Sequence, residues 1–331
     1  MLAVLCPGQG SQSPGLLTPW LELPGVEEQV QAFSWVSSSD LLAHGTTSDA
    51  ETIRDTAVAQ PLIVSASLIA LRALLDGRDA AELVDVTAGH SVGELTAAAV
   101  AGVLTDTDAV RLVTARASSM AHAAAQESTG MSAVVGGEPD EVLSAIAAAG
   151  LHPANVNGGG QVVAAGSLEG LAHLAANPPA RARVIPLQVA GAFHTPYMAS
   201  AREEFGAVLD AHRPADPTVT LLSNADGAAY TDLAAPGQGS GLGAGRDVLR
   251  RIAAQIVAPV RWDECCRTLL DLGVTGLVEL APAGVLTGLA RRTLPGVETV
   301  AVKTPADLDA ARDLVARHTT ASGTPEQEDP A

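Results

Sequence analysis

The stretch Val84-Asp85-Val86-Thr87-Ala88-Gly89-His90-Ser91-Val92-Gly93-Glu94 decides the fold. A β-rich run enters it, and the Ala-rich run 95–101 that follows has the composition of a helix. Between them lies the pattern G-x-S-x-G, which is typical of a strand that turns sharply into a helix and exposes a serine hydroxyl. Gly89 and Gly93 carry no Cβ, so the two arms can pack closely around a strained serine backbone. The alternative is a tight turn without chemistry, because a bare G-x-S-x-G also occurs by chance.

A serine at such a turn is a candidate nucleophile for acyl transfer. Ser91 would lie at the N-terminus of the following helix, where free N–H groups and the helix dipole favour negative charge. The oxyanion that forms during acyl transfer would lie there, and the N–H of Val92 is the first candidate donor to it.

Composition bounds the class of protein. The chain has 331 residues, which allow one large or two modest domains, and 47% of them are hydrophobic but only 2% aromatic. The core must therefore consist of Ala, Val and Leu. The net charge is −18 and Lys303 is the only lysine, so a nucleic-acid partner is not expected, because phosphate binding needs clustered cations. Cys6, Cys265 and Cys266 are too few and too badly spaced for a disulfide framework or a zinc site, which favours a reducing cytoplasm.

The N-terminus predicts a first strand and not a signal peptide. Residues 1–7 lack the basic segment with which a signal peptide begins, and Pro7 follows directly after the first few apolar residues. No uninterrupted apolar run reaches the roughly 18 residues that span a membrane, so no membrane association is expected.

The alternation of strands and helices predicts an α/β fold. We expect a mostly parallel, α/β-hydrolase-like sheet with helices on both faces. Between residues 128 and 190 the order changes to strand-helix-strand-strand-helix-strand, the ferredoxin-like pattern βαββαβ. We therefore expect a discontinuous large catalytic subdomain (1–127 and 191–317), an inserted small subdomain (128–190) and a disordered polar tail (318–331).

Three further side chains are candidates for the site. His194 precedes Thr195-Pro196, a good helix start, at the junction of the two expected subdomains, where a cleft is common. It is the histidine we expect to act as a base, while His90 lies inside the elbow and is expected to fix it. Gln9 lies in a Gly-rich loop whose hydrogen-bonding groups either pair within the loop or approach a ligand. Arg116 shares a helix face with apolar residues, so it is either a structural cation or a carboxylate-binding one.

Several separate motifs occur in one order along the chain. They are Gly8-Gln9-Gly10-Ser11-Gln12, Gly89-His90-Ser91-Val92-Gly93-Glu94, Arg116, Asn155-x-Asn157 followed by Gly160-Gln161-Val162-Val163, His194, Gln255 ahead of Pro259-Val260-x-Trp262, and Pro282-x-x-Val285-Leu286. In this order the chain resembles the malonyl-CoA:acyl carrier protein transacylases from about residue 2 to residue 317.

The resemblance implies roles for the catalytic residues. Ser91 attacks the malonyl thioester, and His194 takes its proton and later returns it to the departing thiol. A main-chain carbonyl at Gln255 orients the imidazole in place of a carboxylate. Gln9 and Val92 correspond to the two main-chain N–H donors of the oxyanion hole.

The resemblance also implies a substrate site. Arg116 grips the free carboxylate of malonyl through its planar guanidinium. Phe193 corresponds to the bulky residue with which related acyltransferases select malonyl over methylmalonyl, and Asn157 and His90 are expected in the same site. Malonyl-CoA and an acyl carrier protein are the implied partners, no cofactor or metal is implied, and we expect a cytoplasmic monomer.

Three departures from the family pattern leave the pathway open between fatty acid and polyketide synthesis. Residues 192–194 are closer to polyketide-type acyltransferases, no glycine follows Arg116 where the family often has one, and the Gly-rich loop 234–245 resembles an insertion. A carrier protein is acidic, so we expect a local positive patch near the cleft, from Arg181, Arg183, Arg250, Arg251 and Arg291.

Two competing functions remain. One is a serine esterase or thioesterase of the α/β-hydrolase type, which would normally place a carboxylate between the serine and the histidine in chain order. Asp106, Asp108 and Asp140 fall there, but all three lie at expected helix starts, where capping explains them. The other is a non-catalytic interaction protein, which the intact Ser91 and His194 disfavour.

Overall fold

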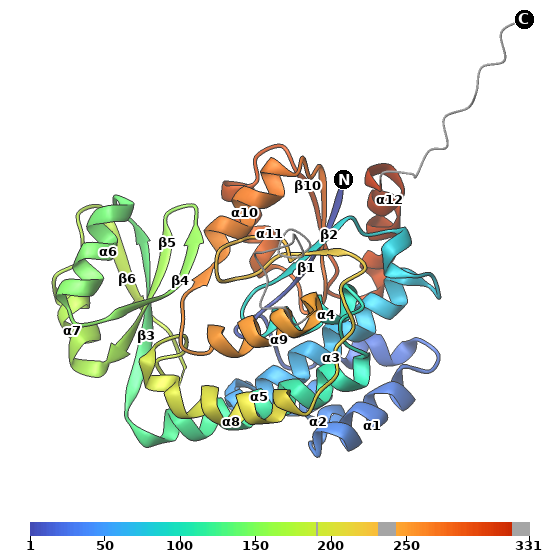
Figure 1. Ribbon diagram of the computed structural model, residues 1–331, viewed down its shortest axis with the longest axis horizontal. Helices are drawn as coiled ribbons and strands as arrows, with labels where there is room; N and C mark the ends of the chain where they lie inside the picture. Colours follow the sequence, from blue (N-terminus) through green and yellow to red (C-terminus); the bar gives the residue numbers. More distant parts are fainter. Residues whose placement is uncertain (190, 231–242, 320–331) are drawn as a thin grey trace, which may run out of the picture.

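A five-stranded, all-parallel sheet carries the Ser91 turn (Figure 1). The computed structural model describes residues 1–189, 191–230 and 243–319, so most of the predicted Gly-rich loop 234–245 lies outside the described residues. The strand order is β10-β9-β1-β2-β7. The strands are β1 (Leu2–Cys6), β2 (Val86–Gly89), β7 (Thr220–Leu221), β9 (Gly276–Glu279) and β10 (Glu298–Ala301).

Both faces of this sheet are buried. On β1, Leu2, Val4 and Cys6 face one hydrophobic cluster, whereas Ala3 and Leu5 face another. Such doubly buried, continuously apolar strands are typical of parallel sheets between helical layers. The helices in this part of the molecule are α1 (Val26–Ser37), α2 (Leu41–Thr46), α3 (Thr56–Leu75), α4 (Gly93–Val100), α5 (Asp106–Gln126), α8 (Ala199–Asp210), α9 (Ala244–Gln255), α10 (Trp262–Asp271), α11 (Val285–Thr293) and α12 (Leu308–His318). Of these, α10 and α11 cover one face and α3, α4, α5 and α12 cover the other, which confirms the prediction of a parallel sheet with helices on both faces.

Helix α3 bears on the expectation that no segment of the chain spans a membrane. By length and composition it is apolar enough to cross a membrane, although the sequence contains no uninterrupted apolar run of that length. The helix contains the polar residues Thr56, Gln60, Ser65 and Ser67, but its mean hydropathy remains high enough for a membrane span. Most of the helix is buried inside the protein, and we interpret it as a core helix.

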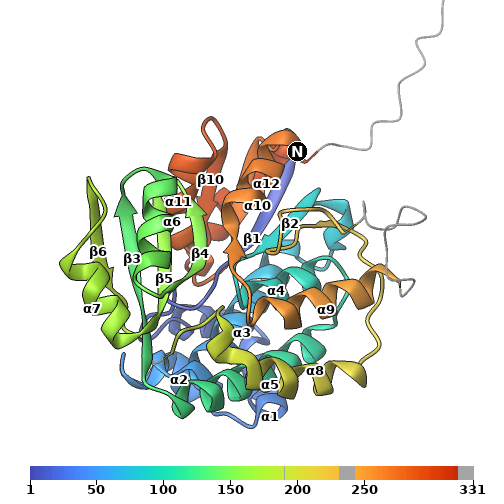
Figure 2. The ribbon, with the colours of Figure 1, turned by 60° about the vertical axis from the view of Figure 1, so that its left-hand side comes forward.

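A second five-stranded sheet lies beside the first in both views (Figures 1 and 2). Its order is β6-β3-β5-β4-β8, and α6 (Pro139–Ala148) and α7 (Leu168–Ala176) pack on it through Val142, Ile146, Leu171 and Leu174. The strands are β3 (Thr129–Gly136), β4 (His152–Gly158), β5 (Gln161–Ser167), β6 (Ala182–Pro186) and β8 (Val260–Arg261). Strand β8 pairs in parallel with β4 although it comes from outside residues 128–190, a contact that was not predicted.

One predicted boundary was wrong. Residue 318 does not belong to a disordered tail: His318 ends α12, and its Nε2 lies 2.9 Å from Glu298 Oε2. Its ring packs over Gly276, where any Cβ would come within 2.5 Å of it. The contact is long-range and has no local sequence signal.

Candidate active site

Ser91 lies on a strained turn between β2 and α4. Its φ is +54°, in the left-handed region that residues with a Cβ seldom adopt. A Cβ on Gly89 would lie 2.0 Å from the Gly93 carbonyl carbon, and a Cβ on Gly93 would lie 2.2 Å from the Cys6 oxygen. Both glycines are therefore required by close packing, as the sequence pattern predicts.

His194 faces Ser91 across the turn. Its Nε2 lies 2.7 Å from Ser91 Oγ, and its Nδ1 lies 2.9 Å from the main-chain oxygen of Gln255. Because a carbonyl oxygen can only accept, Nδ1 carries the proton, and the lone pair of Nε2 points to the serine. His194 also has a positive φ, +60°, so both members of the pair are held in strained backbone.

The imidazole of His194 is kept neutral. Burial lowers its pKa to about 3, and the positive charge of Arg116 acts in the same direction, while the Gln255 carbonyl opposes both. A pKa below the ordinary value means that the neutral form, which alone can accept a proton, is present throughout the neutral pH range.

This shift gives a direct prediction. In a histidine NMR titration, the His194 imidazole should remain neutral down to about pH 5, below the ordinary histidine pKa of about 6.5. A His194 resonance that titrates at or above pH 6.5 would contradict the predicted shift.

Arg116 on α5 lies beside the pair and is fully buried. Its Nη1 donates to Gln60 Oε1 at 2.7 Å, and its Nη2 donates to Gln255 Oε1 at 3.1 Å and lies 3.4 Å from Ser91 Oγ. Its Nε is also buried, and no hydrogen-bond acceptor for it lies among the described residues. Burial lowers the pKa of Arg116 to about 10, with Glu94 opposing, so the side chain stays charged near neutral pH. A buried cation with an unused N–H group next to a nucleophile can bind an anion.

A small cavity of about 80 Å³ opens on the pair. It is lined by Gln9, Gln60, His90, Ser91, Met120, Met131, Asn155, Leu187, Val189, Phe193 and His194. Gln9, Leu187 and Val189 also line a neighbouring cavity of about 370 Å³. Of the predicted residues, Gln9, His90, Ser91, Phe193 and His194 thus line the cavity, whereas Arg116, Gln255, Val92 and Asn157 lie around it without lining it.

His90 and Asn157 lie together at the edge of the site. Nε2 of His90 lies 2.9 Å from Asn157 Oδ1, and the Asn157 amide donates to Gln161 Oε1 at 2.9 Å. The pair therefore connects the elbow to β4 and β5 of the second sheet.

The loop that holds Gln9 packs against the elbow. A Cβ on Gly8 would lie 2.7 Å from the His90 oxygen, and the Gln9 side chain donates to Thr56 Oγ1 at 3.2 Å. The N–H of Ser91 is already bonded to Asn224 Oδ1 at 2.9 Å, so it is not free for an oxyanion. The main-chain N–H groups of Gln9 and Val92 stay predicted donors.

The three aspartates that could have completed a hydrolase triad either pair with an arginine or lie at the start of a helix. Asp106 pairs with Arg72 at 2.5 Å, Asp108 pairs with Arg111 at 2.7 Å, and Asp140 lies in the first turn of α6. Nδ1 of His194 meets a main-chain carbonyl instead of a carboxylate.

Three residues of the site were not predicted from sequence. Glu94, Asn224 and Gln60 are all buried and bond to the predicted site residues Gln255, Ser91 and Arg116, respectively. Glu94 was visible only as the last letter of the elbow motif, and neither Asn224 nor Gln60 has a local signal.

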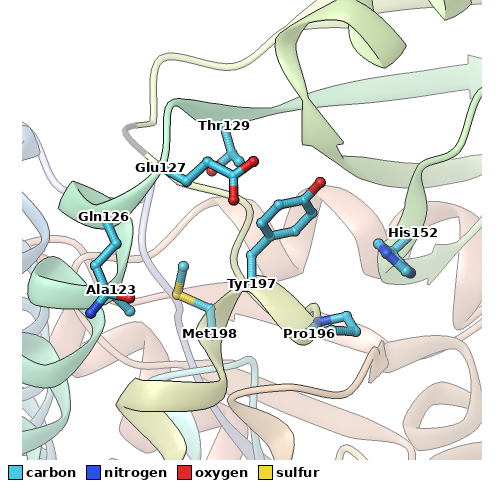
Figure 3. A pocket seen from close by; sticks show the side chains of 8 residues that line it. All are labelled: Ala123, Gln126, Glu127, Thr129, His152, Pro196, Tyr197 and Met198. Carbon is cyan, nitrogen blue, oxygen red and sulfur yellow. The ribbon is translucent and has the colours of Figure 1, made fainter.

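A larger cavity of about 380 Å³ lies elsewhere (Figure 3). Tyr197 stands between Glu127 and His152 there, and its ring centroid is 6.4 Å from that of His152. It shares no lining residue with the Ser91 cavity and contains no paired nucleophile and base. Within the described residues, no three His, Cys, Asp or Glu side chains cluster as metal ligands would.

Carboxylates lie next to three members of the predicted arginine patch. Arg181 pairs with Glu138 at 2.9 Å, Arg250 with Asp247 at 3.4 Å and Arg251 with Asp226 at 2.8 Å. Three of its five members are therefore neutralised by adjacent carboxylates.

Comparisons with known proteins agree with this geometry. The acyl transferase domain family matches residues 4–312. A malonyl CoA-acyl carrier protein transacylase of Mycobacterium tuberculosis is 50% identical over 319 residues, which are 95% of this chain and 100% of that protein. The crystal structure of MCAT from M. tuberculosis superimposes with a TM-score of 0.85 at 49% identity and covers 94% of this chain and 99% of its own. A malonyl-transacylase in complex with a type II PKS acyl-carrier protein superimposes with a TM-score of 0.83 at 28% identity, over 94% of this chain and 99% of its own.

Proposed function

The chain belongs to the acyl transferase domain family, and on that premise we propose that it transfers malonyl from malonyl-CoA to the phosphopantetheine thiol of an acyl carrier protein. One observation carries the proposal: the Ser91–His194 pair, oriented by a main-chain carbonyl, lies within 3.4 Å of a buried arginine. The pair supplies a nucleophile, and the arginine supplies a binding group for the carboxylate that distinguishes malonyl from a simple acyl group.

Transfer proceeds in two matched halves. His194 Nε2 takes the proton of Ser91 Oγ as that oxygen attacks the thioester carbonyl, and the tetrahedral oxyanion lies near the N–H groups of Gln9 and Val92. The C–S bond then breaks, and His194 returns the proton to the departing CoA thiol. The carrier thiol repeats these steps on the malonyl-Ser91 ester, which regenerates the serine.

Arg116 is proposed to hold the malonyl carboxylate. The unused Nε and the adjacent Nη2 offer two parallel donors, the geometry that a carboxylate accepts best. Nη2 must then release Gln255 or Ser91, so this carboxylate replaces contacts that the empty site makes internally. Phe193 lines the cavity next to Ser91 and would limit the room for an additional methyl group.

The remaining assignments follow from the same chemistry. The serine mechanism needs no cofactor, because malonyl-CoA is a substrate, and three buried free cysteines fit a reducing cytoplasm. We infer a monomer with an α/β-hydrolase-like large subdomain and an inserted ferredoxin-like subdomain over 128–190, where the order β6-β3-β5-β4 supports the latter. His90 and Asn157 would contact substrate where the two subdomains meet, and fatty acid and polyketide synthesis are both compatible with the site.

A mixing experiment tests the function. The protein is incubated with malonyl-CoA, with and without an acyl carrier protein, and the products and the Ser91 peptide are followed by mass spectrometry. We expect a malonyl ester on Ser91 without the carrier, and malonyl-carrier when it is added. Rapid release of free malonate with no loaded carrier would instead support the esterase alternative.

A further inference from the structure

Glu94 is a buried carboxylate that the proposed reaction does not use. It lies in the first turn of α4, three residues after Ser91, and it is 3% exposed. Burying a charge is costly unless it is paired or fully hydrogen-bonded. The partners of Glu94 therefore indicate what it does.

Both oxygens of Glu94 accept hydrogen bonds from groups that can only donate there. Oε1 accepts from the main-chain N–H of Asn224 at 2.7 Å, and Oε2 accepts from Nε2 of Gln255 at 2.5 Å. A protonated carboxyl would point its O–H at one of these donors, so the arrangement suits the ionised form. Burial raises the pKa of Glu94 to about 8 although the Asn224 N–H and the charge of Arg116 oppose that rise, so it is the two donors at its oxygens that favour the ionised form.

Gln255 joins Glu94 to two site residues. Its Nε2 donates to Glu94, its Oε1 accepts from Arg116 Nη2 at 3.1 Å, and its main-chain oxygen faces His194 Nδ1 at 2.9 Å. The amide therefore lies between the buried carboxylate and the buried guanidinium, and their opposite charges offset each other through it.

Asn224 joins Glu94 to the elbow. Its Oδ1 accepts from the N–H of Ser91 and from Gln255 Nε2, both at 2.9 Å, and its Nδ2 donates to the Gly89 oxygen at 2.7 Å. It thus holds the turn on both sides of His90, where the strained Ser91 backbone needs support.

We propose that Glu94 is a positioning residue: it fixes Gln255 and Asn224, and through them His194 and Ser91, and it offsets the charge of Arg116 while no malonyl is bound. The inference rests on the proposed function of the Ser91 site. It assigns Glu94 no contact with substrate.

Glu94→Gln is a sharp test because glutamine keeps the shape of the side chain. An amide offers one acceptor and one donor, so one of the two N–H groups at Glu94 must lose its partner. We expect the rate of malonyl-Ser91 formation to fall about 10- to 100-fold, since one buried donor is left unpaired next to the catalytic pair. The KM for malonyl-CoA should stay the same or fall, because Arg116 loses its offsetting charge.

Glu279→Gln is a matched control for damage from losing a buried carboxylate. Glu279 is 0% exposed and accepts from the N–H groups of Gly284, Leu286 and Thr287 at the start of α11. No hydrogen bond of the described residues joins it to the Ser91 site. We expect both variants to lower the melting temperature, but only Glu94→Gln to slow acylation by more than about twofold.

Two other outcomes would overturn the proposed role of Glu94, and a third would refute the proposed function. A folded Glu94→Gln protein that acylates at the wild-type rate would overturn the proposal, because glutamine would then mimic a neutral carboxyl that only fills space. If Glu94→Gln does not fold, Glu94→Asp takes its place: the shorter carboxylate keeps the charge but cannot reach both donors, and an unchanged rate would again overturn the proposal. A wild-type protein that forms no malonyl ester would instead refute the proposed function.

Discussion

The Ser91→Ala and His194→Ala variants are expected to lose malonyl transfer to about the same level, roughly 10³-fold or more below wild type, and the double variant should be no slower. The reason is the 2.7 Å contact between Ser91 Oγ and His194 Nε2. Each residue acts through the other, because a serine hydroxyl is a weak nucleophile without a base, and without Ser91 the base has no nucleophile on which the malonyl ester can form. The measurement is the single-turnover rate of carrier loading from malonyl-CoA.

His90→Gln is the matched control for this prediction. His90 lines the same cavity and is half-buried, but its Nε2 faces Asn157 and not Ser91, and glutamine can still donate to that oxygen. We expect a loss of about tenfold at most, consistent with one neutral hydrogen bond. If the His90 variant were slower than the His194 variant, the assignment of proton transfer to His194 would be wrong.

The elbow and the parallel sheet could be predicted from sequence because both are local. Gly89 and Gly93 flank the serine at a fixed spacing, and doubly buried strands are continuous apolar runs. His194 was found because the helix start at Thr195-Pro196 places it on a loop. Its positive φ has no signal of this kind, since only the packing around it requires that conformation.

The contacts around Arg116 could not be predicted in the same way. Glu94, Asn224 and Gln255 come from three separate segments, and the hydrogen bonds that join Glu94 to the other two cross 130 and 161 residues. Neither periodicity nor capping reports such pairings. The resemblance to a family implied the role of the Gln255 carbonyl, but the use of its side chain between Arg116 and Glu94 emerges only from the fold.

The Arg116→Ala variant is expected to lose malonyl transfer about 100-fold more than acetyl transfer. Malonyl carries a carboxylate that can accept two charge-assisted hydrogen bonds, whereas acetyl offers no group for the guanidinium. The quantity to measure is the ratio of kcat/KM for malonyl-CoA and acetyl-CoA. A ratio is needed because removal of Arg116 also leaves the amide oxygens of Gln60 and Gln255 without their donor, and this damage affects both substrates alike.

Two further variants separate charge from geometry. Arg116→Lys keeps the positive charge but not the planar fork, so it should restore only part of the preference for malonyl. Arg111→Ala removes an arginine from the same helix that is exposed and pairs with Asp108 at 2.7 Å, and it should leave the ratio unchanged. Equal losses of malonyl and acetyl transfer in Arg116→Ala would show that the arginine only supports Gln255 and Ser91. The malonyl carboxylate would then have to bind elsewhere in the cavity.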